Sequence, residues 1–167
     1  QEYVQQQNLQ DAVSVSKDGG KIFIRFSQSV FFAGESAVLR PEAYSILDAV
    51  SEMLSSVASS LDEVRVQGHT ARPKKEPNNV VTDRTLSSQR AANVIIYIQQ
   101  HSTVNPARLV SEGLGEWRPI APNDTAENLA KNRRVEMIIS GRDLEAEENG
   151  LSTLDQYVVQ EFEVIAS

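Results

Sequence analysis

Apolar residues recur along this chain at two different spacings, and each spacing predicts a different kind of element. Over 21–27, apolar and polar positions alternate, which predicts a strand with one strongly buried face. The alternation over 64–67 predicts a second strand, which ends at Gly68. Between them, residues 43–57 place apolar side chains at intervals of three and four, which predicts an amphipathic helix beginning at Pro41. The three elements form a βαβ unit, whose right-handed crossover makes the two strands parallel.

Further helices and strands are expected downstream. Residues 72–82 lack periodicity and are rich in Pro, Lys and Asn, so we expect a surface loop there. A helix over 86–100 follows, with Asp83 or Thr85 as its N-cap. The remaining expected elements are a strand near 108–112, a short helix over 126–131 and a strand over 134–139. The sequence therefore predicts an α/β (α+β) fold, a two-layer βαβαβ(α)β sandwich whose mixed sheet carries its helices on one face.

The two ends of the chain differ from this central part. Residues 1–20 begin polar and Gln-rich, and we expect a linker or the end of an upstream helix. Residues 21–141 are expected to form one domain. Residues 142–167 combine an acidic linker with an amphipathic segment, whose apolar positions run from Leu154 to Ile165 at helical spacing, although its β-branched residues also allow a strand. This apolar face packs on its own domain, on a partner or on a second copy, and the sequence leaves all three open.

Composition and charge narrow the classes of function. The chain has 167 residues and a formal net charge of −7, which argues against nucleic acid as a partner. It has no cysteine, which removes thiol chemistry and thiolate metal sites. Its two histidines, His69 and His101, lie far apart without acidic partners at metal spacing, and no Gly-x-Ser-x-Gly elbow is present. The sequence therefore predicts no enzyme, no metal site and no cofactor.

Five short motifs follow one another along the chain. They are GHTA at 68–71, LSSQRA at 86–91, GLG at 113–115, RPIAPNDT at 118–125 and NRRVE at 132–136. In this order and spacing the set resembles the OmpA/MotB-like family of peptidoglycan-binding domains, over residues 21–140. The resemblance implies an OmpA-like fold and, as ligand, the peptide stem of peptidoglycan, typically through its diaminopimelate residue.

Diaminopimelate ends in a free amino-acid group, so its site needs a cation for the carboxylate and an anion for the ammonium. The resemblance makes Arg90 the cation, whose planar fork suits a carboxylate. The alternative is that Arg90 pairs with a neighbouring acid and fixes the loop. The family's ammonium-binding aspartate falls on Ala71, which has no charge. Asp83 either supplies the missing anion or simply caps the helix. We hypothesise that wall binding is weakened or altered in this chain.

Three further residues complete the binding site that the resemblance implies. Thr70 is expected to close the pocket by hydrogen bonding. Leu86 and Ser87 open the helical motif that also contains Arg90, one turn before it. His69 is expected to hold the loop, with no catalytic role.

Within the family, the segments 31–37, 39–43 and 118–125 look most like the branch of flagellar stator proteins. That branch implies a non-covalent anchor that holds a stator to the cell wall. It also implies a periplasmic location within an inner-membrane protein, a homodimer, and a MotA-like partner subunit reached through a transmembrane segment missing from this sequence. The alternatives are a generic wall-tethering lipoprotein or secretion-system anchor, and a protein-binding scaffold that has lost the wall ligand.

Overall fold

The computed structural model describes residues 12–73, 76–77 and 79–142. In chain order its elements are β1 (Val13–Asp18), β2 (Lys21–Ser27), α2 (Gln28–Phe31), α3 (Pro41–Ser56), the 3-10 turn Ala58–Ser60, β3 (Leu61–His69), α4 (Val80–His101), the 3-10 turn Pro106–Arg108, β4 (Leu109–Gly115), α5 (Ala126–Asn132) and β5 (Arg134–Gly141). The expected segment 142–167 lies outside the described residues except for Arg142. Among the described helices, none has both the length and the hydropathy to span a bilayer.

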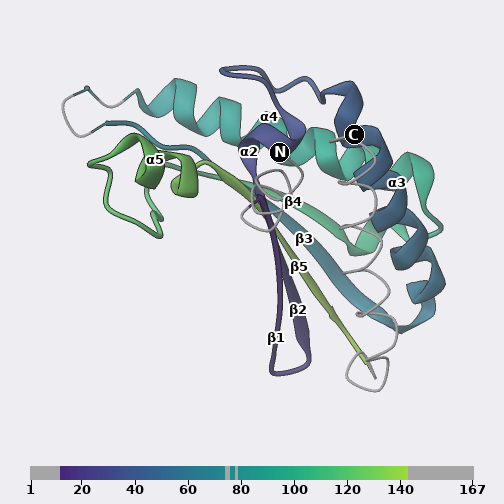
Figure 1. Cartoon of the computed structure of the whole chain (residues 1–167). Coiled ribbons are helices and arrows are strands. Elements are labelled where there is room, and N and C mark those ends of the chain that lie inside the picture. Colours follow the sequence, from purple (N-terminus) through teal and green to yellow (C-terminus); the bar gives the residue numbers. More distant parts are fainter. Residues whose placement is uncertain (1–11, 74–75, 78, 143–167) are drawn as a thin grey trace, which may run out of the picture.

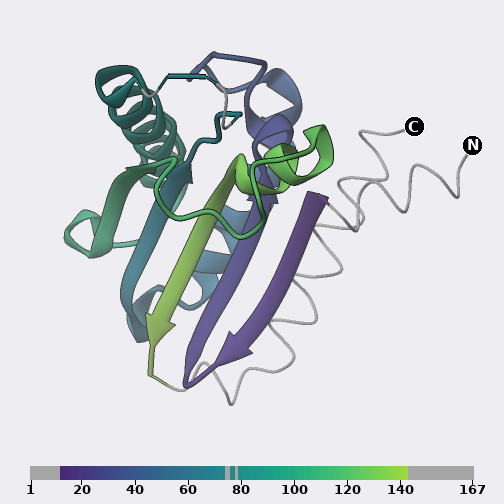
Figure 2. The same ribbon diagram turned by 90° about the vertical axis from the view of Figure 1, so that its left-hand side faces the viewer.

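The strands form one mixed sheet in the order β1-β2-β5-β3-β4. Figure 2 shows this sheet with β1 at one edge and β4 at the other. Strand β5 pairs antiparallel with both β2 and β3, so β2 and β3 run parallel with β5 between them. Strands β3 and β4 pair directly and parallel. The expected parallel relation of the first two strands is correct, but they are separated by β5 because the last strand of the chain inserts between them.

Helices α3 and α4 cover one face of the sheet, and the apolar core lies between these two layers (Figure 1). Strands β2, β3 and β5 contribute alternate residues to this core because side chains alternate between the faces of a strand. Its most deeply buried members include Ile24, Phe26, Leu47, Val64 and Met137. The two-layer arrangement with a mixed sheet confirms the fold class expected from the sequence.

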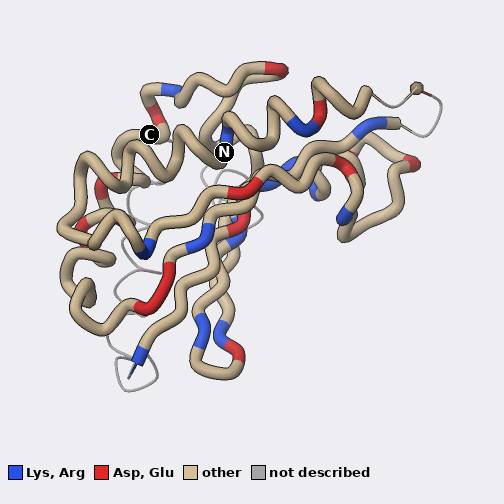
Figure 3. The backbone as a smooth tube through the Cα atoms, turned by 180° about the vertical axis from the view of Figure 1, so that it is seen from behind, with Lys and Arg blue, Asp and Glu red and all other residues tan. Residues whose placement is uncertain are grey.

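The opposite face of the sheet carries pairs of charged residues across neighbouring strands (Figure 3). Arg25 of β2 contacts Glu136 of β5 at 3.1 Å, from Nε to Oε1. Arg65 of β3 contacts Glu63 of the same strand and Glu112 of the neighbouring strand β4, each at 2.7 Å. Cross-strand pairs of opposite charge stabilise a sheet face that meets water. This face therefore needs no second layer of helices.

Two boundaries differ from the expectations. Residues 1–20 were expected to be a linker or helix end, but Val13–Asp18 form an edge strand paired antiparallel with β2. The turn between them is Gly19–Gly20, and both glycines have the positive φ that a two-residue hairpin favours. Helix α4 begins at Val80, earlier than expected, and the side chain of Asn79 caps it by accepting from the Thr82 N–H at 3.1 Å.

Candidate functional site

Close packing of α4 against β3 and β4 fixes the position of the candidate site. A Cβ at Gly68 would overlap the backbone carbonyl of Ser87, and a Cβ at Gly113 would overlap Ser88. Ser87 is fully buried, and its hydroxyl donates to the Asp83 carbonyl at 2.7 Å and accepts from the Gly115 N–H at 3.1 Å. Ser87 therefore joins α4 to the end of β4, and its hydroxyl is enclosed by these contacts.

Arg90 holds the loop that follows α2. Its side chain projects from α4 and is 3% exposed. Nη2 donates to the Gly34 carbonyl at 2.6 Å and Nε donates to the Ser36 carbonyl at 3.0 Å, while the guanidinium lies 5.4 Å from the centre of the Phe32 ring. Burial lowers the pKa of Arg90 below that of a free arginine, but a guanidinium keeps its charge in proteins. Among the described residues, Arg90 has no acidic ion-pair partner, so it fixes the loop through backbone carbonyls.

Thr70 and Ala71 directly follow β3 in the chain. The Thr70 N–H donates to the Gly115 carbonyl at 2.9 Å, and Thr70 Oγ1 is enclosed without a hydrogen-bond partner among the described residues. Ala71 is half-buried, and its carbonyl accepts from Arg133 Nη2 at 3.5 Å. Arg133 has no acidic ion-pair partner in the described part of the chain. Ala71, where the family's aspartate would stand, therefore lies next to Arg133, whose charge has no acidic partner among the described residues.

Arg72, the residue after Ala71, contacts three carboxylates. Its guanidinium lies 3.1 Å from Asp83 Oδ1, 3.5 Å from Glu116 Oε2 and 3.7 Å from Glu76 Oε2. Burial, and next the charge of Asp83, raise the pKa of Glu116. Asp83 lies in the first turn of α4 and does not cap it, because Asn79 holds that position.

The arrangement brings together most of the residues expected from the sequence. Arg90, Asp83, Ser87 and Thr70 are buried around the junction of α4 with the ends of β3 and β4, and Leu86 is half-buried on the same helix. Arg72, for which the sequence predicted no partner, pairs with Asp83. The sequence assigned no role to Glu116, which lies outside the five motifs, and left the role of Glu35 open.

His69 is buried beneath this junction, on the charged face of the sheet. Its Nε2 lies 3.7 Å from Glu136 Oε2, and neither ring nitrogen has a hydrogen-bond partner among the described residues. Burial, and next the charge of Arg134, lower the pKa of His69 to about 4, although Glu136 opposes this. The imidazole is therefore neutral at neutral pH. Across the described residues, no group of His, Asp or Glu side chains is arranged to hold a metal ion.

A family model described as the OmpA family matches residues 31–133, so the chain belongs to the OmpA family. Among solved structures, a putative MotB-like protein from Desulfovibrio vulgaris is similar to this chain, with a TM-score of 0.68 and 27% identity over 84% of this chain and 92% of that chain. Motility protein B of Bacillus subtilis is 25% identical over 142 residues, which are 85% of this chain and 54% of that protein. These findings confirm the family expected from the motifs and the likeness to MotB.

A relative outside motility is also similar. The peptidoglycan-binding protein ArfA of Mycobacterium tuberculosis is 33% identical over 111 residues, which are 66% of this chain and 32% of ArfA. The chain spans between 54% and 62% of the length of three other curated relatives that it matches. The family and fold belong to a domain class that binds or anchors, rather than to a class of enzymes.

Proposed function

We propose that this domain binds peptidoglycan non-covalently through its stem peptide and thereby anchors a flagellar stator to the cell wall. The observation that carries the proposal is Arg90. Its guanidinium is held rigidly by two backbone carbonyls, and its Nη1 makes no hydrogen bond within the described residues. A guanidinium that is already oriented loses little entropy when it binds a carboxylate. Similarity to the peptidoglycan-binding protein ArfA supports this ligand class.

A second arginine adds to the affinity for a carboxylate in this proposal. Arg133 lies close enough to Arg90 for its charge to lower the pKa of Arg90. Neither arginine has an acidic ion-pair partner among the described residues, so the region between them is positive. A buried or half-buried positive region binds an anion more strongly than an exposed one, because water screens it less. Thr70, Ala71, Asp83, Leu86 and Ser87 form the surroundings of this proposed ligand site.

The stator role rests on the likeness to Motility protein B and to the MotB-like structure. It implies a periplasmic domain of an inner-membrane protein that forms a homodimer and works with a MotA-like subunit. In this mechanism no bond is broken. Wall binding holds the stator still, so that ion flow turns the rotor, and modest affinity suffices when several copies bind together.

Wall binding is tested by sedimenting the protein with purified peptidoglycan sacculi, for the parent, Arg90→Ala, Arg90→Lys and Arg108→Ala. The control Arg108 is an exposed arginine just before β4, at the opposite end of that strand from the site. Loss of a charge-assisted, two-point contact costs about 1.5–3 kcal/mol, so both Arg90 variants should bind about 10- to 150-fold more weakly. Circular dichroism of each variant separates lost binding from lost folding.

Each outcome separates the candidate functions. A parent that does not sediment with sacculi would overturn wall binding and leave a protein-binding scaffold, which Ala71 favours. Wall binding together with normal swimming, after deletion of the encoding gene in its own host, would overturn the stator role and leave a general wall tether.

A further inference from the structure

Three carboxylates near Ala71 share one arginine. Arg72 contacts Asp83, Glu116 and Glu76 at 3.1–3.7 Å. Asp83 Oδ2 and Glu116 Oε2 are enclosed by the protein, so a ligand does not reach these atoms without displacing their neighbours. An ammonium that approached Asp83 would also meet the positive charge of Arg72. The carboxylates beside Ala71 are therefore poor replacements for the missing aspartate.

Glu35 is exposed, unlike Asp83 and Glu116, and it is not paired with Arg72 as all three of these carboxylates are. It is the central residue of a segment whose two flanking carbonyls, those of Gly34 and Ser36, accept hydrogen bonds from Arg90. The Gly34 carbonyl also accepts from Gln28 Nε2 at 3.1 Å. These three hydrogen bonds fix the backbone on either side of Glu35, while its side chain is exposed. The loop therefore holds an exposed acidic residue between the two carbonyls that the buried guanidinium binds.

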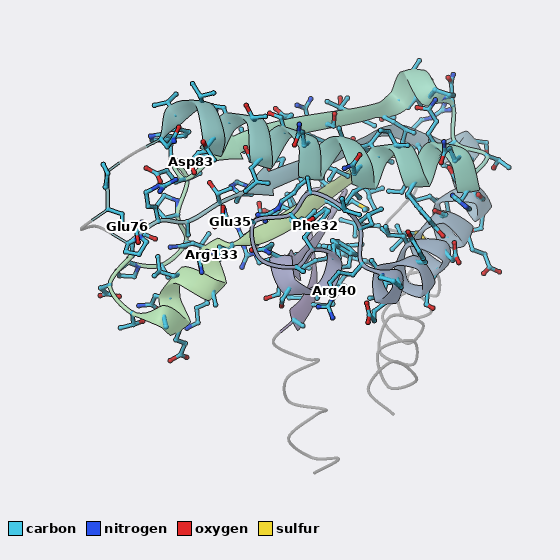
Figure 4. The ribbon with its side chains drawn as sticks, turned by 90° about the horizontal axis from the view of Figure 1, so that it is seen from above. Phe32, Glu35, Arg40, Glu76, Asp83 and Arg133 are labelled. Carbon is cyan, nitrogen blue, oxygen red and sulfur yellow. The ribbon has the colours of Figure 1, made fainter. Side chains whose placement is uncertain are left out.

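The charge of Glu35 affects the pKa of Arg90, although the two side chains do not form an ion pair. Glu35 raises the pKa of Arg90, against the larger effect of burial, which lowers it. No ion pair joins Glu35 to any cation in the part of the chain that the structure describes. Seen from above in Figure 4, Glu35 stands at the tip of its loop, between Asp83 and Arg133 in that view. The charge of Glu35 therefore reaches the guanidinium, while its carboxylate has no ion-pair partner among the described residues and is available to a ligand.

We infer that Glu35 supplies the anion that Ala71 lacks, and that it binds the ammonium of a ligand whose carboxylate is held by Arg90. The inference rests on the proposed function and names the ligand's chemistry, an ammonium and a carboxylate on one carbon. Such a group needs an anion and a cation that are close together but not paired with each other. Glu35 and Arg90 meet this requirement, and the fixed loop reduces the entropy lost on binding.

The test is a cycle that changes the protein and the ligand together. The parent and Glu35→Gln are titrated calorimetrically with two stem tripeptides, one ending in diaminopimelate and one ending in 2-aminopimelate, which lacks the distal ammonium. Loss of one charge-assisted contact should weaken the binding of Glu35→Gln to the diaminopimelate peptide about tenfold. Its binding to the aminopimelate peptide should stay within about twofold of the parent, because that peptide has no ammonium for Glu35 to bind.

The matched control is Glu76→Gln, which removes an exposed carboxylate from the neighbouring Arg72 cluster. Its binding to both peptides should stay within about twofold of the parent, because screened charges at this distance contribute little. Equal weakening of both peptides by Glu35→Gln would overturn the inference, as would unchanged binding of the diaminopimelate peptide. A parent that binds neither peptide would overturn the proposed function as well. If the parent binds the diaminopimelate peptide but Glu35→Gln gives either of these results, the inference fails and the proposed function stands.

Discussion

The packing of α4 on the sheet predicts that Gly68→Ala destabilises the protein. The backbone of Gly68 does not adopt a positive φ, so alanine fits its conformation. The added methyl group, however, overlaps the carbonyl oxygen of Ser87. Because this atom belongs to the helix backbone, no side-chain rotation relieves the overlap, and α4 must move away from β3. Overpacking of this kind costs about 1–3 kcal/mol, and replacement of glycine restricts the unfolded chain by about 0.4–1 kcal/mol in the opposite direction.

The same displacement should reach the candidate site. Arg90 lies on α4, one turn beyond Ser87, and its hydrogen bonds to Gly34 and Ser36 are 2.6 and 3.0 Å long. Hydrogen bonds weaken steeply when their distance or angle departs from these values. We therefore expect Gly68→Ala to loosen the loop that contains Glu35 and to weaken sacculus binding in addition to lowering the free energy of unfolding.

Urea denaturation followed by circular dichroism measures the change in stability. We expect Gly68→Ala to lower the free energy of unfolding by about 1–2 kcal/mol. The control is Ser111→Ala, on the exposed edge strand β4, which should stay within about 0.5 kcal/mol of the parent. A Gly68→Ala protein as stable as this control would refute the reasoning, since it would mean that α4 does not approach β3 as closely as described.

Three further predictions concern buried polar groups. Arg72→Gln should lower the free energy of unfolding, measured in urea, by about 1–3 kcal/mol, because it leaves Asp83 buried without its ion pair. Adding Asp83→Asn should recover part of this loss. A double variant no more stable than Arg72→Gln would contradict the unpaired carboxylate as the cause. The pKa of His69 is about 4 in the folded protein and about 6.5 in the unfolded chain, so the unfolded chain takes up a proton first as pH falls. Stability should therefore fall by at most about 3 kcal/mol between pH 6.5 and pH 4, and His69→Phe should lack that component. A His69→Phe protein with the pH profile of the parent would exclude His69 as its source. Asn132→Ala should lower the free energy of unfolding by about 2–3 kcal/mol, because the Asn132 amide makes four hydrogen bonds of 2.6–2.9 Å. The thermal midpoint of unfolding should fall accordingly, and an unchanged midpoint would contradict the role of these hydrogen bonds.

Periodicity predicts the elements whose one face is buried in the core. The bounds of strand β2 and helix α3 were predicted nearly correctly, because the apolar residues of each element are the ones buried in the core. The start of α4 was missed because Val80 and Val81 are exposed, so its first turn carries no amphipathic signal. Strand β1 was missed because an edge strand with two half-buried valines differs little from a polar linker.

The candidate site was predictable in its positions and not in its contacts. The motif located Arg90, yet its acceptors Gly34 and Ser36 lie more than 50 residues earlier in the chain. No local pattern indicates such a pairing, because it depends on how the loop after α2 meets α4. The pairing of Arg72 with Asp83 was not predicted for the same reason, since charge alone does not tell which of several neighbours an arginine contacts.

The consequence of Ala71 depends on its neighbours rather than on the substitution alone. An aspartate at this position would lie between Arg72, which already contacts three carboxylates, and Arg133, which contacts the Ala71 carbonyl. Its charge would be shared with both arginines before any ligand arrived, and part of its attraction for an ammonium would be lost. With alanine, Arg133 stays unneutralised by any described acid and favours the ligand's carboxylate, while Glu35 is the carboxylate left for the ammonium. In the proposed site, Arg90 and Glu35 would thus supply both charges that a zwitterionic ligand requires, although position 71 carries no acid.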